Sequence, residues 1–436
     1  FAIALLDAVN ASFLEGRRWV VEVEADPELD PRLLSPYIRL FNAMDQLWGH
    51  SMMPEEILLK TNRGWTRFDT QASLHPQPCE PQGVKPDLIV RLQPYRTGFD
   101  RLDPPSGDTP EIVLRSARLP VLVRDDLFEP GERVNVDGVD LQDMEAALTE
   151  VLQGVFAKQS FREGQLEALV EILEGRDCAV LLPTGGGKSL IYQMAGICKP
   201  GRTIVIDPLI ALMEDQQRGL AEHGIDRVIG FSRFQVAQGR LDVLLRQVES
   251  GDALFIFIAP ERLQQSRFRN SIRSLAQATP INLAVIDEAH CVSEWGHQFR
   301  TAYLTLGSVL RQVCKDVFDS APPLIALTGT ASRAVLKDVL IQLAISADSE
   351  RSIIRPTSFD RSELEMTVRR SEPEESPSIL TGSLRALPTR FGVPASEFFR
   401  PRAERTFSGI IFCPHTSGSY GIMDIQRTIA GVVGFQ

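Results

Sequence analysis

Short runs of apolar residues alternate with longer helix-length segments from Asp177 onward. The apolar runs are hydrophobic on both faces, which is typical of strands buried in a parallel sheet. They occur at Cys178–Leu182, Thr203–Ile206, Leu254–Ile258, Leu283–Ile286 and Leu324–Leu327. Because the segments between them are long enough for crossover helices, the pattern predicts an α/β fold with a doubly wound parallel sheet.

The remaining parts of the chain lack this regular alternation of strands and helices. Helices are predicted at Phe1–Glu15, Pro31–Trp48 and Leu141–Phe156, with short strand-like pieces between them. Residues 1–150 are therefore expected to form a small α+β domain. The alternating strands and helices are expected to form a second domain over 151–365. A polar, proline-containing stretch predicts a linker or insertion over 366–405. The apolar run Gly409–Cys413 then predicts the first strand of a second lobe within 406–436.

Charge and composition narrow the class of protein. The 436 residues are 43% hydrophobic, and no apolar run reaches the length of a membrane span, so we expect no membrane association. Residues 1–150 contain 15 Lys/Arg against 26 Asp/Glu, whereas the rest is balanced. The acidic part is expected to bind protein rather than DNA, although a solvated surface is an equal alternative. Six cysteines without a C-x-x-C pair argue against zinc knuckles and favour a reducing cytoplasm.

The strongest chemical signal is the run Leu182-Pro183-Thr184-Gly185-Gly186-Gly187-Lys188-Ser189, which lies between a predicted strand and a helical segment. Glycines let the backbone curl so that successive N–H groups and the helix N-terminus point at phosphate oxygens. In such a loop Lys188 would contact the β- and γ-phosphates of a nucleoside triphosphate, and Ser189 would ligate magnesium. The run therefore predicts a P-loop NTPase.

Two carboxylates, Asp287 and Glu288, follow the predicted strand Leu283–Ile286. The carboxyl ends of the strands in a doubly wound sheet converge on one crevice, so this acidic pair is expected beside the glycine loop. Asp287 would hold the water shell of magnesium, and Glu288 would orient and deprotonate the attacking water. The loop and the pair together predict Mg²⁺-dependent hydrolysis of a nucleoside triphosphate.

The run Asp287-Glu-Ala-His-Cys-Val-Ser-Glu-Trp-Gly-His-Gln-Phe-Arg300 resembles the Walker B motif and aromatic-rich loop of RecQ-like DNA helicases of superfamily 2. Further matches occur in the order of that family, at Phe161–Gln165, Pro208–Met213, Ala259–Leu263, Leu327–Ala331 and Ser358–Arg361. The resemblance covers about residues 155–415. It implies that the doubly wound sheet is a RecA-like lobe and that a second RecA-like lobe begins near the end of the chain.

The resemblance also implies which residues bind ATP. These are Arg162, Gln165, Thr184, Gly185, Gly186, Gly187, Lys188 and Ser189. The amide of Gln165 matches the donor and acceptor edge of adenine, which predicts ATP rather than GTP. Arg162 would stack on the base or pair with phosphate. His290 would complete the catalytic set of Lys188, Asp287 and Glu288 by sensing the γ-phosphate, or would serve as a structural hydrogen-bonding group.

DNA contacts are predicted at Pro208, Leu209, Arg262, Trp295, His297, Phe299 and Arg300. Aromatic faces and a guanidinium spaced through a loop can stack on unpaired bases and grip phosphate, although core packing is the alternative for such a cluster. Asp207 precedes Pro208 directly, and an acid so near the expected phosphate track disfavours that particular contact.

The resemblance implies an ATP-dependent DNA helicase or translocase of the bacterial cytoplasm or nucleoid that uses ATP and Mg²⁺ and moves 3′ to 5′ on single-stranded or forked DNA. One alternative is a DNA-activated ATPase that acts as a sensor or remodeller in a DNA-modification or defence complex without separating strands. An inactive motor that holds DNA and an RNA helicase are weaker alternatives. Residue 1 is Phe and no arginine-finger motif precedes Gln436, so we expect a fragment that binds ATP and hydrolyses it slowly by itself.

Overall fold

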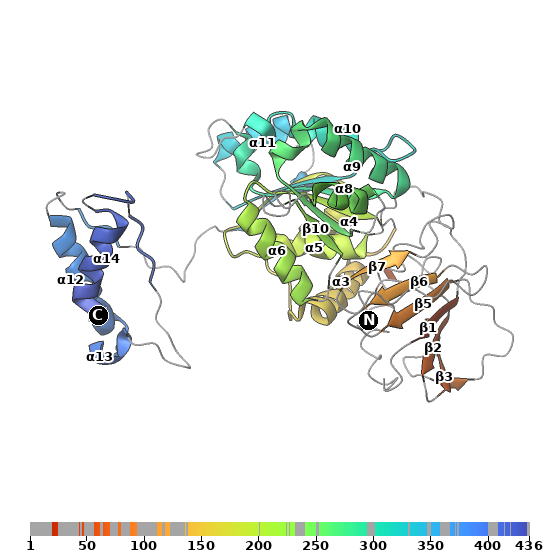
Figure 1. Cartoon of the computed structure of the whole chain (residues 1–436), viewed down its shortest axis with the longest axis horizontal. Helices are drawn as coiled ribbons and strands as arrows, with labels where there is room; N and C mark the ends of the chain where they lie inside the picture. The colour runs from red at the N-terminus through yellow and green to blue at the C-terminus, as the bar shows by residue number, and fades with distance from the viewer. Residues whose placement is uncertain are drawn as a thin grey trace. The chain divides into compact units, whose positions relative to one another are not determined.

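The computed structural model describes seven strands before residue 123, a few isolated positions such as Ala43 and Val136, and most of residues 138–433 (Figure 1). Within 138–433 the description leaves out 200, 224, 226, 232–239, 250–252, 294–300, 330–331, 347–349, 358–366, 371, 373–374, 400–408, 414 and 419. Residues 1–359 and 360–436 form two compact units, which are described separately.

The larger sheet has seven strands, all parallel, in the order β10-β11-β9-β12-β13-β8-β14. The strands are β8 (Cys178–Leu181), β9 (Arg202–Ile206), β10 (Val228–Gly230), β11 (Phe255–Ile258), β12 (Ile281–Ile286), β13 (Leu324–Thr328) and β14 (Ile353–Ile354). All five strands predicted from the apolar runs are present within two residues of their expected bounds. The predicted α/β fold with a doubly wound parallel sheet is confirmed.

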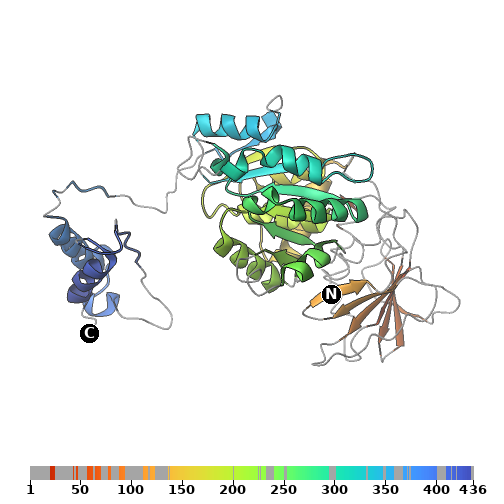
Figure 2. The same cartoon turned by 45° about the horizontal axis from the view of Figure 1, so that its top comes forward.

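Helices cover both faces of this sheet (Figure 2). The buried side chains of α3 (Leu141–Phe156), α4 (Gln165–Leu173), α5 (Lys188–Cys198) and α6 (Ile210–Glu222) pack in one hydrophobic core. Those of α8 (Leu241–Glu249), α9 (Ser266–Ala278), α10 (Leu306–Val313) and α11 (Arg333–Gln342) pack in a second core. Successive residues of β12 alternate between the two cores, as in Ala284 and Val285, because side chains of a strand point to opposite faces.

Four short 3₁₀ helices lie in the connections of this sheet among the described residues. They are η4 (Pro260–Gln264), η5 (Ala289–Val292), η6 (Thr301–Tyr303) and η7 (Glu350–Ser352). Two of them, η4 and η5, begin directly after the carboxyl ends of β11 and β12, the edge at which the glycine loop also lies.

Helix α3 has the bounds that its apolar period predicts, and it is capped at its N-terminus by Asp140, whose carboxylate accepts a hydrogen bond from Gln142 N at 2.8 Å. Its buried residues include Leu148 and Val151, which belong to the same core as α4 and α5. The domain boundary expected at residue 150 would cut through this helix. The packing instead places all of α3 with the larger sheet.

The first 122 residues contribute a second sheet of seven strands, in the order β4-β3-β2-β1-β5-β6-β7. The strands are β1 (Val20–Glu24), β2 (Glu56–Thr61), β3 (Gly64–Asp69), β4 (Gln77–Cys79), β5 (Leu88–Gln93), β6 (Glu111–Arg115) and β7 (Arg118–Leu122). The central strands β2, β1, β5 and β6 are parallel, and the outer strands are antiparallel. The helix predicted at Phe1–Glu15 lies outside the described residues. Of Pro31–Trp48 only three residues are described, all of them helical.

The unit Asp360–Gln436 contains the helices α12 (Ser376–Arg390), α13 (Ala395–Phe398) and α14 (Ile422–Val433). The stretch expected to be a linker or insertion therefore contains two of them. Pro377 does not prevent α12, because it lies in the first helical turn, where a missing N–H costs nothing.

The strand predicted at Gly409–Cys413 is wrong. These residues have no regular secondary structure, and Ile410 and Phe412 are 82% and 91% exposed. A buried strand forms only where neighbouring strands accept and donate its backbone hydrogen bonds. No strand is assigned among the described residues after Phe359, so the expected start of a second RecA-like lobe is not seen there.

None of the helices among the described residues combines the length and the apolar run that crossing a bilayer demands.

Candidate nucleotide site

The glycine-rich loop connects the end of β8 to the start of α5. Gly185 and Gly187 have φ values of +80° and +77°, which only glycine adopts at no steric cost. A turn is closed by Gly186 N, which donates to Pro183 O at 2.8 Å. No side chain caps the first turn of α5, so its N–H groups point into the loop as donors for an anion. The loop thus has the conformation that phosphate binding requires.

Gln165, the first residue of α4, holds this loop through its side-chain amide. Its Nε2 donates to Gly186 O at 3.1 Å and to Gly187 O at 3.0 Å, and its Oε1 accepts from Arg162 N at 2.8 Å. The Arg162 guanidinium donates to Gly185 O. Gln165 is only 2% exposed. Both functional groups of the amide are therefore engaged by the protein, and reading an adenine edge would require these bonds to exchange.

The acidic pair lies at the carboxyl end of β12. Asp287 N donates to Ile206 O of β9 at 2.8 Å, and the Asp287 carboxylate accepts from Glu288 N at 2.9 Å. Burial raises the pKa of Asp287 to about 6, although Lys188 and the hydrogen bond from Glu288 N oppose this rise. Glu288 has a φ of +48°, an unusual conformation for a residue with a side chain, and it turns the chain directly into η5.

His290 connects the acidic pair to β13, the strand that lies between β12 and β8. Its Nδ1 lies 3.2 Å from Glu288 Oε2 and 3.2 Å from Thr328 Oγ1. Interactions with the side chains of Cys291 and Glu288 raise the pKa of His290 to about 9, so the ring is cationic at neutral pH. The hydrogen bond between His290 and Glu288 is also the largest of the effects that lower the pKa of Glu288. Glu288 is consequently ionised at neutral pH, as a residue that orients water must be.

Lys188 lies close to both halves of the site. Its positive charge lowers the pKa of Asp287 and of Glu288, in each case against the effect of burial. A Cβ atom added to Gly329 would come within 3.0 Å of Lys188 Nζ and 3.4 Å of Thr184 Oγ1. Thr328, the residue before Gly329, accepts a hydrogen bond from Leu182 N through its carbonyl oxygen. The glycine loop and the acidic pair therefore share one edge of the sheet, with the end of β13 between them.

The residues at this edge suit magnesium. Mg²⁺ takes oxygen ligands and is commonly held by one or two carboxylates together with substrate phosphates and water. Asp287 offers a carboxylate that is 8% exposed, and Ser189 offers a hydroxyl in the first turn of α5. Among the described residues no group of three or more His, Cys, Asp and Glu is placed to hold a metal ion.

The predicted DNA-contact residues divide into two groups. Trp295, His297, Phe299 and Arg300 lie outside the described residues. Pro208 and Leu209 follow β9, and Arg262 lies in η4 with its guanidinium carbon 5.5 Å from the centre of the Phe268 ring.

Asp207, which would disfavour phosphate contact if it were exposed, is 1% exposed. Its carboxylate accepts a hydrogen bond from Leu209 N at 2.8 Å, just before α6 begins. The negative charge is thus turned into the protein and away from the surface at Pro208.

The sequence did not single out Tyr192, which lies in the hydrophobic core near the acidic residues of the site. It lies three residues after Ser189 on α5 and is fully buried. Burial, together with the charges of Asp287 and Asp207, raises the pKa of its hydroxyl well above the usual range. The one available signal was its spacing of about one helical turn from the P-loop serine, which places both side chains on one face.

Comparison with known proteins places these residues in a recognised domain. Residues 162–339 match the model of the DEAD/DEAH box helicase family. Over 211 residues the chain is 37% identical to the probable ATP-dependent DNA helicase RecS of Bacillus subtilis, covering 48% of this chain and 40% of that protein. Over 245 residues it is 35% identical to the ATP-dependent DNA helicase RecQ of Pasteurella multocida, covering 55% of this chain and 36% of that one.

A eukaryotic relative matches the same part of the chain. The RecQ-like DNA helicase BLM of Xenopus laevis is 36% identical over 230 residues, which are 52% of this chain and 16% of that protein. The chain spans less than half the length of each of these three relatives. The resemblance predicted from the motifs is confirmed over about half of the chain.

Proposed function

Because residues 162–339 form a DEAD/DEAH box helicase domain similar to RecQ and RecS proteins, we propose that this protein is an ATP- and Mg²⁺-dependent DNA helicase or translocase. It moves 3′ to 5′ on single-stranded DNA and acts on forked DNA. The cell compartment in which it works is the bacterial cytoplasm or nucleoid. The acidic residues of the first 150 positions offer a surface for a protein partner.

The observation that carries the proposal is the approach of Lys188 to Asp287 and Glu288 at one edge of the sheet. Lys188 and the free N–H groups of α5 bind the phosphates of ATP, and Glu288 holds the attacking water in line. Ser189 and Asp287 would hold magnesium, which when bound would supply positive charge beside the phosphates. These roles need only positioning and charge stabilisation, which is the main contribution of proteins to phosphoryl transfer.

The same edge of the sheet connects the nucleotide site to the proposed DNA contacts. Pro208 follows β9 and Arg262 follows β11, so the proposed strand contacts begin at the strand ends that surround the nucleotide site. His290 contacts both Glu288 and Thr328, and through Thr328 it reaches the strand β13. We propose that His290 transmits a movement of Glu288 at the γ-phosphate to β13 through these two contacts. Contact with DNA through backbone phosphates suits an enzyme that moves along any sequence.

The proposal is tested with the purified protein, single-stranded DNA and forked duplexes. ATP hydrolysis should rise on addition of single-stranded DNA, and a fork with a 3′ tail should be unwound whereas one with a 5′ tail should not. Lys188→Ala should lower hydrolysis by about 100-fold or more, since it removes the charge at the transferred phosphate. Arg218→Ala, on the surface of α6, is the matched control and should change neither activity.

Two outcomes would overturn parts of this proposal. DNA-stimulated hydrolysis without unwinding of either fork would favour the DNA-activated sensor or remodeller over the helicase. Hydrolysis that is indifferent to DNA, or stimulated by RNA in preference to DNA, would remove the DNA motor altogether.

A further inference from the structure

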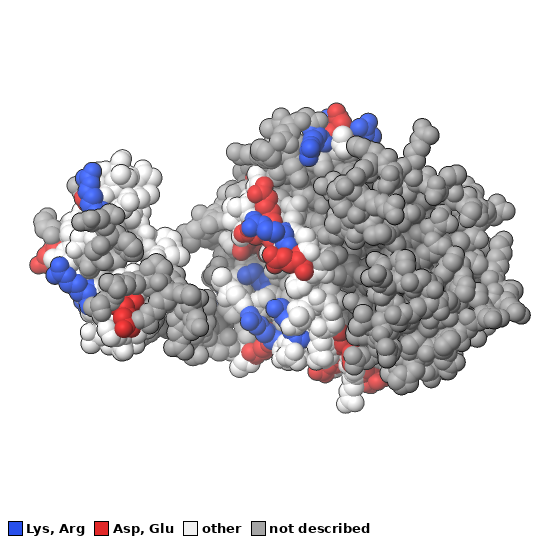
Figure 3. All heavy atoms as spheres, turned by 60° about the horizontal axis from the view of Figure 1, so that its bottom comes forward, with Lys and Arg blue, Asp and Glu red and all other residues white. Residues whose placement is uncertain are grey.

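The two faces of the larger sheet carry opposite charge. Helices α3, α4, α5 and α6 contain two basic and eight acidic residues, whereas α8, α9, α10 and α11 contain seven basic and three acidic residues. On the surface that Figure 3 shows, basic and acidic side chains of the described residues lie next to one another. A domain with this charge distribution presents one face that attracts polyanions.

The positive charge is concentrated on α9. This helix contains Arg267, Arg269 and Arg273 and no acidic residue. Its exposed residues Arg267, Asn270, Arg273, Ser274 and Gln277 are spaced by three or four positions, apart from the neighbours Arg273 and Ser274. They therefore share one face of the helix and extend over about 15 Å. Arg273 donates to the neutral amide oxygen of Asn270 at 3.2 Å, a bond that leaves its charge uncompensated.

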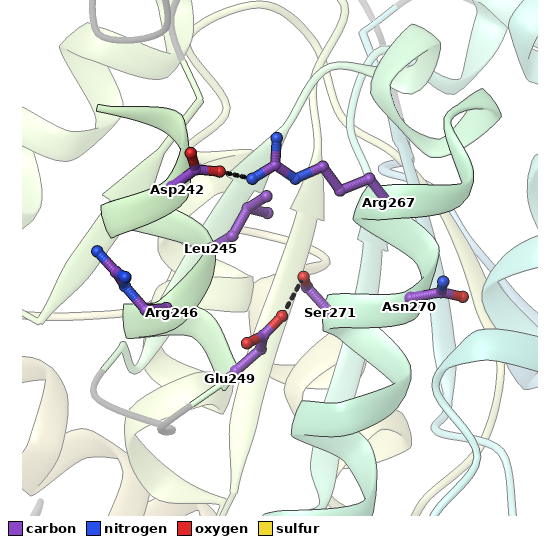
Figure 4. A pocket seen from close by; sticks show the side chains of 7 residues that line it. All are labelled: Asp242, Leu245, Arg246, Glu249, Arg267, Asn270 and Ser271. Atoms are coloured by element: carbon purple, nitrogen blue, oxygen red, sulfur yellow. Dashed lines mark hydrogen bonds and ion pairs between the residues drawn. The ribbon is translucent and has the colours of Figure 1, made fainter. Parts of the chain in front are cut away.

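Two depressions lie along this face. The first, of about 330 Å³, is the groove between α8 and α9, and the second, of about 500 Å³, is lined by Asn270, Arg273, Ser274 and Gln277. Figure 4 shows how the groove is crossed: Asp242 pairs with Arg267, and Ser271 donates to Glu249 at 2.5 Å. Arg246 of α8 lines the same groove and is exposed. Asn270 lines both depressions, which therefore lie next to each other along α9.

We propose that the exposed face of α8 and α9 is a second DNA-binding surface, which holds the phosphate backbone of duplex DNA outside the nucleotide site. The inference rests on the proposed function, and it specifies where the double-stranded part of a fork lies. Arg246 and Arg273 are its principal phosphate contacts. Asn270, Ser274 and Gln277 supply neutral hydrogen-bond donors beside them, as is common in contacts with DNA phosphates.

The position of α9 in the fold supports this assignment. The helix begins two residues after η4, the segment that contains Arg262 and the proposed strand contact. From there it runs back along the sheet from the carboxyl edge. A nucleic acid that leaves the strand track at Arg262 therefore meets Arg267 first and Arg273 about 9 Å further along.

The lining chemistry favours a duplex over a single strand. Surfaces that hold single strands combine basic groups with aromatic side chains on which bases stack. None of the residues that line the two depressions is aromatic. A duplex has its bases paired inside and presents phosphates at one charge per about 1.7 Å of axis, so arginine and amide donors suffice for it.

The test compares Arg246→Ala/Arg273→Ala with the unchanged protein in binding to a blunt duplex without ATP. Neutralising two phosphate contacts should lower the slope of log Kd against log salt by about 2 and weaken binding roughly tenfold or more at 0.1 M salt. Arg218→Ala, which removes an exposed arginine paired with Asp215 at 2.7 Å on the acidic face, is the control and should leave the slope unchanged. Equal thermal unfolding midpoints establish that the variants are folded.

The outcomes separate this inference from the proposed function. Hydrolysis stimulated by a saturating single strand should be the same in the double variant and the unchanged protein, because neither arginine belongs to the nucleotide site. An unchanged duplex slope in the double variant would overturn the second surface, whatever the hydrolysis shows. Equal losses for duplex and single strand would identify a general DNA track and overturn the duplex assignment. Retained duplex binding with loss of an acidic protein partner would assign the face to protein instead.

Discussion

Removal of the Gln165 side chain should weaken the binding of every nucleotide triphosphate, because its amide holds the glycine loop. Gln165→Ala deletes the donor that serves Gly186 O and Gly187 O and the acceptor of Arg162 N. The three partners would be left without these bonds at a site where Gln165 itself is 2% exposed. Because two carbonyl oxygens of the loop lose their donor, we expect the loop to sample other conformations before nucleotide binds.

The size of the effect follows from the two bonds to the loop. A net contribution of about 1 kcal/mol for each gives about 2 kcal/mol, which a nucleotide must repay when it orders the loop. This free energy corresponds to an affinity about 30-fold lower. Gln165→Glu should lower affinity at least as much, because a carboxylate would face the two carbonyl oxygens in place of an N–H donor.

The assay is equilibrium binding of ATP and GTP, measured by competition with a fluorescent nucleotide in the presence of Mg²⁺. Both affinities should fall in Gln165→Ala, and any excess loss for ATP measures adenine reading by the same side chain. Gln193→Ala is the matched control, because Gln193 is also buried but its amide donates to Gln216 on α6 at 3.1 Å. It should leave both affinities near their original values.

GTP affinity that is unchanged in Gln165→Ala while ATP affinity falls would refute the loop-holding role. It would show instead that Gln165 acts only on the base, as the resemblance to RecQ-like helicases implies.

Three further predictions concern the same edge of the sheet. Gly329→Ala should leave the unfolding midpoint nearly unchanged but lower ATP affinity severalfold in a binding titration, because the new methyl group would press on the flexible end of Lys188, 3.0 Å away. Mg²⁺-dependent nucleotide binding should weaken as pH falls through about 6, because protonation of Asp287, whose pKa is raised to about 6, removes the charge of a metal ligand. The loss should reach up to about tenfold per pH unit. Asp287→Asn should lose this pH dependence in a Mg²⁺ titration. Because the pKa of His290 is raised to about 9, protonated His290 should contribute its full stabilisation below about pH 6.5 and lose it as the pH rises through 9. In His290→Gln, the free energy of unfolding should no longer fall over that pH range.

Much of the larger sheet was predictable because its central strands are buried on both faces. Residues of β12 and β13 pack into two cores at once, and this demands the continuous apolar runs that the sequence displays. The edge strands β10 and β14 have three and two residues, which is too short for a periodic pattern to be visible. The glycine loop and the acidic pair were predictable for a related reason, since each needs particular residue types within a few positions.

Features that depend on distant partners were harder to predict. The apolar residues of Gly409–Cys413 satisfy the local pattern of a strand, but a strand also needs neighbours that the pattern does not supply. Gln165 carries the correct chemistry for adenine, yet its amide is occupied by loop carbonyls whose orientation depends on the left-handed glycines. In both cases the local residues allow more than one structure, and contacts from elsewhere select between them.

The order of the strands explains why Thr328 connects the two halves of the site. Along the chain, the glycine loop and the acidic pair are separated by about a hundred residues, and Thr328 follows both. In the sheet, β13 lies between β12 and β8, so its carboxyl end must fall between Glu288 and the loop. Its last residue then bonds to Leu182 N through the backbone and contacts His290 through its hydroxyl. Any strand in this position would meet both halves, and a polar side chain at its last residue can contact the histidine while the backbone holds the loop.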